Sequence, residues 1–180
     1  MSDVDAAADR RRQLDDLIDE VYVPLQRYLR RRTDATTAED VLAEVLLTLW
    51  RRLDDVPPDA RLPWSYGVAR RCLANTVRGE QRRLRLVERL SAVPVVEPPE
   101  EHGLAEALAS CSDADRELLR LWAWEQLPPR EIAVVLGVTP NAVSIRLHRA
   151  LGRLRTRMDP GKRPRDPGHL PGRRGKEATR

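Results

Sequence analysis

Residues 127–155 (LPPREIAVVLGVTPNAVSIRLHRALGRLR) carry the signals of two short helices joined by a tight turn. Pro129 suits the first turn of the first helix, and Gly137 stands where a left-handed residue would end that helix. Thr139 then supplies an N-cap oxygen, and Pro140 a preset φ at the first position of a second helix. The order of these signals predicts a helix-turn-helix, a motif whose second helix enters a DNA groove.

The second helix of this motif has two distinct faces. Val143, Leu147, Ala150 and Leu154 recur at helical spacing and are expected to be buried. The opposite side and its flanks offer hydrogen-bonding groups, an apolar tip for a thymine methyl and guanidinium groups for guanine or phosphate. We expect DNA contacts from Thr139, Asn141, Ser144, Ile145, Arg146, His148 and Arg149. The alternative is a solvated amphipathic helix with a basic face, but the cap, the turn glycine and both faces agree with the motif.

Several other classes of protein are disfavoured by composition. No run of eighteen apolar residues occurs, and the charged N-terminus does not resemble a secretory signal, so we expect a cytoplasmic protein with no membrane insertion. Cys72 and Cys111 are far apart and lack partners at metal-ligand spacing, which argues against a disulfide or a metal site. No phosphate loop, nucleophile with its base or paired carboxylates are present, so we expect neither an enzyme nor a cofactor.

The basic residues are concentrated in two places within the folded part of the chain. Residues 146–157 contain five Arg and no acid, and residues 70–89 contain seven Arg against two Glu. Residues 159–180 add seven Lys or Arg against three acids, which accounts for the whole net charge of +4. Two local basic patches beside acidic stretches indicate DNA on one side and protein partners elsewhere.

Three helices are predicted in residues 10–90. Apolar residues at helical spacing indicate a helix over residues 10–32, which Pro24 should kink. Thr36 and Glu39 form the pattern of a capping box, and a second helix with Trp50 in its core face should follow. A third, long helix is expected from about Pro63 to residue 90. Three helices suffice for a small bundle.

A proline-rich stretch, residues 91–103, predicts a flexible linker and hence a domain boundary. A short helix is expected over residues 104–111, and Ser112 with Asp115 should cap another that runs to Glu125. Residues 159–180 are expected to form a disordered basic tail. The predicted fold is therefore all-α, with an N-terminal bundle at residues 10–90 and a four-helix domain at residues 104–158.

The long third helix bears a second basic surface. Its arginine stripe, defined here as Arg71, Asn75, Arg78, Arg82 and Arg85, falls on one face at spacings of three and four. Such a stripe can follow a phosphate backbone while the amide reads a base, although a solvated face is the usual fate of a charge run. Of the two preceding aromatic residues, Trp64 is expected in the core, whereas Tyr66 could lie in the core or stack on an unpaired base.

These segments together resemble one family. Residues 37–51 (TAEDVLAEVLLTLWR) resemble the polymerase-binding helix of sigma-2 domains, residues 61–83 resemble the promoter-opening helix that follows it, and residues 108–155 resemble a sigma-4 domain. Their order, spacing and size are those of extracytoplasmic-function (ECF) sigma factors of the sigma-70 family. The resemblance covers residues 14–157 and implies a protein that binds core RNA polymerase, carries it to a promoter and helps to open the DNA.

The resemblance also implies roles for individual residues. Contacts to the clamp coiled coil of the polymerase are expected from Asp40, Glu44 and Arg51. Contacts to the minus-10 element are expected from Arg61, Tyr66, Arg71, Asn75, Arg78 and Arg82, with a flipped base held by the loop at residues 55–62. The residues of the second helix of the helix-turn-helix would face the minus-35 element. Further implied partners are the flap of the polymerase and an anti-sigma factor.

The sequence departs from the family at several positions. Ala43 replaces a common Gln, which weakens one polymerase contact, and Ser112 replaces the Pro that usually opens its helix. Arg71 and Asn75 replace a common Asn and Asp, so the minus-10 preference does not follow by analogy. Ser65 follows Trp64 where primary sigma factors carry a second aromatic residue, which favours melting by base capture.

An alternative reading is a helix-turn-helix regulator that binds operators as a dimer, without the polymerase. Such a protein would need a dimerisation or ligand-sensing region. Residues 10–90 carry the arginine stripe and the helix with Asp40 instead, which favours the sigma factor.

Overall fold

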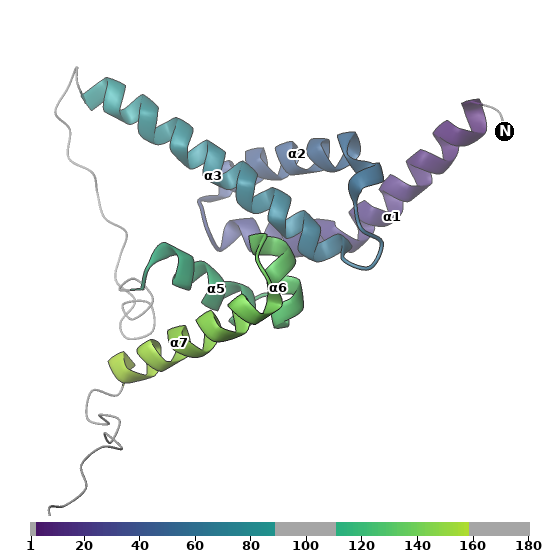
Figure 1. The fold of residues 1–180 in the computed structure, drawn as a ribbon. Coiled ribbons are helices and arrows are strands. Elements are labelled where there is room, and N and C mark those ends of the chain that lie inside the picture. Colours follow the sequence, from purple (N-terminus) through teal and green to yellow (C-terminus); the bar gives the residue numbers. More distant parts are fainter. Residues whose placement is uncertain (1–2, 89–110, 159–180) are drawn as a thin grey trace, which may run out of the picture.

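The computed structural model describes residues 3–88 and 111–158, and every regular element within these ranges is a helix (Figure 1). The predicted all-α fold is confirmed. The elements, in chain order, are α1 (Asp3–Arg30), α2 (Ala35–Arg51), the short 3-10 helix η1 (Leu53–Asp55), α3 (Arg61–Glu88), α5 (Asp113–Ala123), α6 (Pro129–Leu136) and α7 (Pro140–Met158). The predicted linker at 91–103 and tail at 159–180 lie outside the described residues, as does all of the helix predicted at 104–111 except residue 111.

The first three helices pack on one another with an aliphatic core. Leu25 of α1, Val45 and Leu49 of α2, and Ala69 of α3 are fully buried where these helices meet. The helical period of leucine and valine predicted this core. The first helix is longer than predicted, because it begins at Asp3 instead of residue 10. Residues 3–10 lack an apolar stripe, so the sequence pattern gave no sign of this first segment.

The predicted capping box of α2 is wrong. Asp34 is the N-cap, and its carboxylate accepts a hydrogen bond from the backbone N–H of Thr37 at 3.0 Å. That bond lowers the pKa of Asp34, because it stabilises the ionised carboxylate. Thr36 lies inside the helix, and Glu39 pairs with Arg30 at 3.4 Å instead. A carboxylate two residues earlier in the chain therefore caps the helix in place of the predicted hydroxyl.

The last three helices form the predicted helix-turn-helix with α5 packed against it. Ser112 caps α5 by accepting from the N–H of Asp115 at 3.2 Å, and Thr139 caps α7 by accepting from the N–H of Ala142 at 3.3 Å. Gly137 ends α6 in the left-handed region, with φ 67°. Gln126, between α5 and α6, is a second residue in the left-handed region, with φ 54°, and it was not predicted from the sequence.

Gly137→Ala is expected to lower the free energy of unfolding by about 1 kcal/mol, because an L side chain is strained at this φ. Space is not the cause, since a Cβ at Gly137 would meet nothing within 4 Å. Gly152→Ala is the matched control: Gly152 is helical and equally open, so alanine there should stabilise the protein by about 0.5–1 kcal/mol. Urea denaturation measures the free energy of unfolding of both variants. The explanation would be contradicted if both substitutions changed that free energy by the same amount in the same direction.

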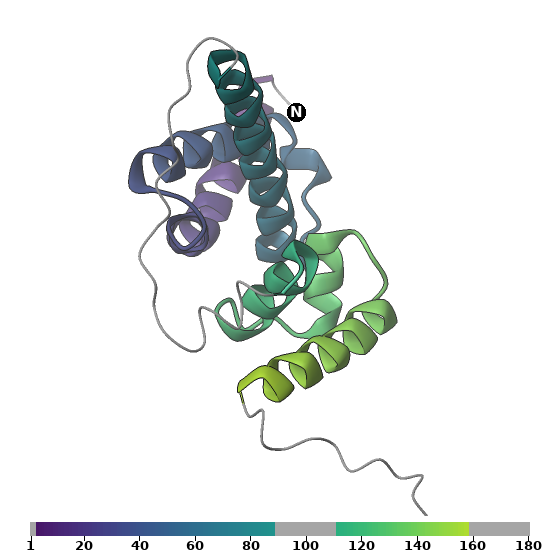
Figure 2. The ribbon, with the colours of Figure 1, turned by 90° about the vertical axis from the view of Figure 1, so that its left-hand side faces the viewer.

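The two groups of helices are packed together. Seen in two orientations, α3 runs across α1 and α2 and meets α6 near its N-terminal end (Figures 1 and 2). A Cβ added at Gly67 of α3 would lie 3.7 Å from the Cα of Val135 in α6, so the helices approach closely there. The rings of Tyr28 and Tyr66 contact each other beside this crossing, with centroids 4.9 Å apart. The buried side chains of both groups form one continuous core.

Candidate nucleic-acid interface

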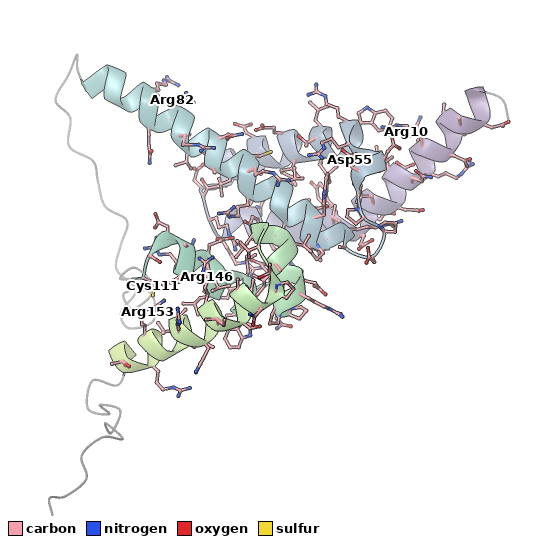
Figure 3. All side chains as sticks on the ribbon, in the orientation of Figure 1. Arg10, Asp55, Arg82, Cys111, Arg146 and Arg153 are labelled. Atoms are coloured by element: carbon pink, nitrogen blue, oxygen red, sulfur yellow. The ribbon has the colours of Figure 1, made fainter. Side chains whose placement is uncertain are left out.

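The outward face of α7 is exposed as predicted (Figure 3). Val143 and Ala150 are fully buried and Leu147 is nearly so, which fixes the rotation of the helix against α5 and α6. The residues left on the surface are Thr139, Asn141, Ser144, Ile145, His148 and Arg149, with Arg146 half-buried on the flank. All seven predicted residues therefore lie on the accessible part of the helix or at its edge.

The arginines of α7 differ in what they are free to bind. Arg153 donates to the carboxylate of Asp115 at 2.5 Å and so ties α7 to α5. Arg149 is exposed and pairs with no acidic side chain in the described part of the chain. The hydroxyl of Ser144 donates to the carbonyl of Pro140 at 3.0 Å, which leaves its oxygen as an acceptor. Within the described residues, Arg149 is thus an exposed guanidinium of this face that no acidic side chain occupies.

Four members of the arginine stripe lie exposed along α3: Arg71, Asn75, Arg78 and Arg82. The side chain of Arg85 lies outside the description. A guanidinium N–H of Arg78 donates to Oδ1 of the exposed Asn75 at 2.7 Å, so the amide NH₂ of Asn75 takes no part in that bond. A shallow groove of about 480 Å³ is lined by Asn75, Arg78, Gln81 and Arg82. The stripe is therefore a continuous basic surface with one oriented amide in it.

Two predicted minus-10 residues are not on this surface. Tyr66 is only 3% exposed, and its ring packs on Tyr28, so its assignment to the DNA face is corrected. Burial, followed by the charge of Glu125, raises the pKa of Tyr66 to about 12. Arg61 is half-buried at the start of α3 and pairs with Glu20 of α1 at 3.5 Å. The sequence left Tyr66 open between core and surface, and the contact of its ring with Tyr28 of α1 places it in the core.

The loop before α3 adds a hollow of about 280 Å³. Residues of α1, of η1 and of this loop line it: Gln13, Leu17, Leu53, Asp54, Val56, Pro58 and Arg61. The loop lies at residues 55–62, where a flipped base was expected. The hollow combines apolar walls with polar groups, which suits a flat, partly polar ring.

The face of α2 that carries the predicted polymerase contacts is also exposed. Asp40, Glu44 and Arg51 lie at spacings of four and seven along one side of the helix. Leu47 and Trp50 are exposed on the same helix, Trp50 to 42%, so the expectation that Trp50 is a core residue is wrong. The guanidinium of Arg10 covers the Trp50 ring at 5.5 Å and pairs with Asp54 at 2.7 Å. An apolar centre flanked by charges is typical of a protein interface.

Other kinds of site find no support in the described residues. No group of three or more His, Cys, Asp or Glu side chains there could hold a metal ion. Neither Cys72 nor Cys111 forms a disulfide, and both are buried; burial raises the pKa of Cys72 to about 11. No described helix is long and apolar enough to cross a membrane.

One group of helices presents a helix-turn-helix, and the other presents an arginine-rich helix. This combination is typical of DNA-binding proteins. Residues 102–154 match the family described as Sigma-70, region 4. The chain is 32% identical over 154 residues to the ECF RNA polymerase sigma factor SigL of Mycobacterium tuberculosis, across 77% of this chain and 85% of the relative. The chain belongs to the ECF sigma factors, which act in transcription initiation.

Solved structures show the same fold at low sequence identity. CnrH, in complex with the cytosolic domain of CnrY, matches with a TM-score of 0.59 and 23% identity over 88% of this chain and 96% of that chain. The sigma factor RpoE of Bartonella quintana, in complex with the anti-sigma factor NepR, matches with a TM-score of 0.55 and 18% identity over 88% of this chain and 99% of that chain.

Proposed function

We propose that this sigma factor binds core RNA polymerase, reads a minus-35 element with α7 and a minus-10 element with α3, and assists melting. RNA synthesis itself remains with the polymerase, in the cytoplasm. The observation that carries the proposal is the pair of accessible basic faces on separate groups of helices, α7 and the arginine stripe. In this scheme residues 10–90 are the sigma-2 domain, residues 91–103 the linker and residues 104–158 the sigma-4 domain.

The minus-10 element would meet α3 in two ways. Arg71, Arg78 and Arg82 would bind phosphates along the strand, and the NH₂ of the exposed Asn75 would donate to an acceptor on a base edge. A flipped base would enter the hollow beside the loop at residues 55–62. Flipping costs a few kcal/mol, which a hollow already formed next to a basic surface can offset.

In this scheme α2 would contact the clamp coiled coil of the polymerase, and the sigma-4 domain would contact its flap. The double variant Asp40→Ala/Glu44→Ala is expected to weaken binding to core polymerase about tenfold, since each exposed charge contributes up to about 1 kcal/mol. Binding is measured by co-purification and by titration of labelled protein with core polymerase, without DNA and at low salt.

Glu39→Ala is the matched control for this face. It removes one acidic group from the same helix, but its carboxylate pairs with Arg30 beside the first turn. Its affinity for core polymerase should stay within twofold of that of the parent protein. No binding by the parent protein at low salt would refute the sigma-factor mechanism and favour the operator-binding alternative.

An anti-sigma factor is a further proposed partner. Support comes from the relative RpoE of Bartonella quintana, whose structure was solved with the anti-sigma factor NepR. Transcription-start mapping after overexpression gives the promoter elements and the regulated genes together. It also identifies the promoter DNA that binding measurements require.

A further inference from the structure

A groove rich in arginine lies between α3 and α5, beside the C-terminal end of α1. Its volume is about 460 Å³, which is the size of a small-molecule site. We call it the interhelical groove. Two carboxylates line it, those of Asp113 and Glu117. The guanidinium groups that line it come from Arg32, Arg70, Arg78, Arg116 and Arg120. Positive charge therefore exceeds negative charge among the described residues of its wall.

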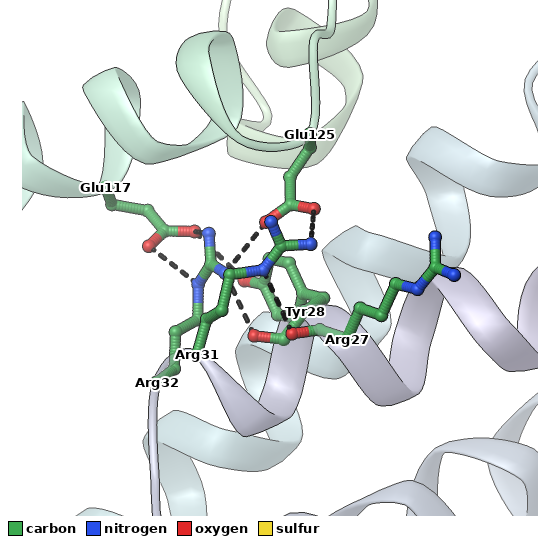
Figure 4. A network of polar contacts seen from close by, with 6 residues as sticks. All are labelled: Arg27, Tyr28, Arg31, Arg32, Glu117 and Glu125. Carbon is green, nitrogen blue, oxygen red and sulfur yellow. Dashed lines mark hydrogen bonds and ion pairs between the residues drawn. The ribbon is translucent and has the colours of Figure 1, made fainter.

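Both carboxylates of the groove are already paired. The guanidinium of Arg32 donates to the two carboxylate oxygens of Glu117 at 3.1 and 3.2 Å (Figure 4). Arg32 also donates to Glu125 at 3.0 Å, and its side chain is only 3% exposed. Asp113 accepts from Arg116 at 3.0 Å. The acids of the groove thus offset the charges of Arg32 and Arg116, and a ligand does not have to compete for these two arginines.

The other three arginines of the groove have no such partner. Among the described residues, no carboxylate forms an ion pair with Arg70, Arg78 or Arg120. The Nε atom of Arg120 is buried and has no hydrogen-bond partner in the described part of the chain. Burial, followed by the charge of Arg32, lowers the pKa of Arg120. An anion bound in the groove would supply the missing counter-charge.

The wall that α3 contributes is a different face from the arginine stripe. Its residues recur at spacings of four, three and four, and so share one side of the helix: Arg70, Ala74, Val77 and Gln81. Arg71, the first residue of the stripe, lies about 100° further around the helix. Arg78 belongs to the stripe and also lines the groove. The two surfaces therefore adjoin at Arg78 without being the same surface.

The same wall includes apolar surface. Val77 is 38% exposed, and the half-buried Leu73 lies one turn before it on α3. An inorganic anion gains nothing from such surface, whereas a flat ring gains by covering it. Guanidinium groups for a charged end and apolar surface for a ring are what a nucleotide needs.

We propose that the interhelical groove is a binding site for a nucleoside polyphosphate. The phosphates bind the guanidinium groups of Arg70, Arg78 and Arg120. The base covers the apolar surface of Leu73 and Val77. Several linked phosphates match three guanidinium groups better than a single phosphate does, because each guanidinium donates to its own pair of oxygens. The site is additional to the two DNA surfaces and does not depend on promoter recognition.

Isothermal titration calorimetry of the full chain with ATP tests the site, without divalent cations and at constant ionic strength. A single ATP molecule is expected to bind per chain. Arg70→Ala and Arg120→Gln should each weaken binding roughly tenfold, because each removes a charged donor to phosphate. Arg70 is exposed, so its replacement tests the site even if Arg120→Gln disturbs the packing of α5.

Val77→Glu tests the apolar wall. It places a carboxylate among the phosphates and should also weaken ATP binding by roughly tenfold or more. The matched controls are Arg83→Ala on α3 and Arg130→Ala on α6, which remove exposed arginines that do not line the groove. Their affinity for ATP should stay within about twofold of that of the parent protein. Circular dichroism checks that each variant keeps its helices.

Two further ligands test the chemical class. Inorganic tripolyphosphate should bind roughly tenfold more weakly than ATP, because it has no ring to cover the apolar wall. Equal affinities for the two would overturn the assignment to a nucleotide. A single-stranded oligonucleotide should bind Arg70→Ala as well as it binds the parent protein. If its affinity falls as much as that of ATP, the groove belongs to a DNA strand and the proposal is wrong.

Two results would overturn the site altogether. One is no ATP binding by the parent protein. The other is a loss of ATP affinity in the control variants as large as in Arg70→Ala, which would mean that ATP is attracted to any basic surface of the chain. Neither result bears on the proposed function, because binding to core polymerase is measured separately and without nucleotide.

Discussion

Tyr28→Ala is expected to lower the free energy of unfolding by about 3–5 kcal/mol, the range found when a buried aromatic side chain is truncated. Tyr28 is fully buried, and three kinds of contact converge on it. Its ring packs on Tyr66, the guanidinium of Arg32 lies over its face, and its hydroxyl donates to Glu117. Truncation leaves a cavity at the point where α1, α3 and α5 meet.

Urea denaturation followed by circular dichroism gives the free energies. Tyr22→Ala is the control on the same helix: Tyr22 is 39% exposed, and its loss should cost less than about 1 kcal/mol. Tyr28→Phe keeps the ring and removes the donor to Glu117, so its cost should fall between the other two. Equal costs for Tyr22→Ala and Tyr28→Ala would show that this junction contributes nothing to stability.

The local parts of the fold could be predicted from the sequence because their causes are local. Gly137, Thr139 and Ser112 act on backbone groups within a few residues, and the structure places each in its predicted role. The cap of α2 shows where this reasoning becomes ambiguous. Asp34 and Thr36 are both good N-cap residues two positions apart, and the apolar stripe of the helix does not decide between them.

The contact between the two groups of helices could not be predicted. Arg32 and Glu117 are separated by 85 positions, and Arg32 and Glu125 by 93, so no helical period or cap links them. Arg31 and Arg32 read as ordinary solvated charges at the end of a helix. Glu117 in α5 and Glu125, two residues beyond the end of α5, read in the same way. Only the packing of α5 against α1 turns this apparent surface charge into a buried network.

The residues of the candidate site also separate into those that local sequence could place and those that it could not. Helical spacing placed the exposed side of α7 and the arginine stripe correctly, because a helix with one buried face must expose the other. Spacing did not reveal that Tyr66 is covered or that Trp50 is uncovered. Both are large and aromatic, and each lies beside the apolar stripe of its helix. Whether such a residue is buried depends on which residues of other elements pack against it, as Tyr28 of α1 packs against Tyr66, and helical spacing carries no information about those residues.

Arg149→Ala is expected to weaken binding to the minus-35 element by about 1–3 kcal/mol if its guanidinium contacts a base edge. The expectation rests on its freedom: Arg149 is exposed near the middle of α7 and pairs with no acidic group in the described ranges, whereas Arg153 is held by Asp115. A guanidinium with no other partner can donate two parallel hydrogen bonds to the acceptor atoms of guanine. Its loss leaves those acceptor atoms without a donor.

The measurement compares holoenzyme binding to the mapped promoter and to a promoter with a scrambled minus-35 element. Arg155→Ala is the control, because Arg155 is also exposed but lies six residues further along α7, about 120° around the helix from Arg149. It should change affinity for both promoters alike and reduce the salt dependence by about one phosphate contact. An equal loss on both promoters for Arg149→Ala would show that Arg149 binds only phosphate, and minus-35 specificity would then rest on Asn141, Ser144 and Ile145.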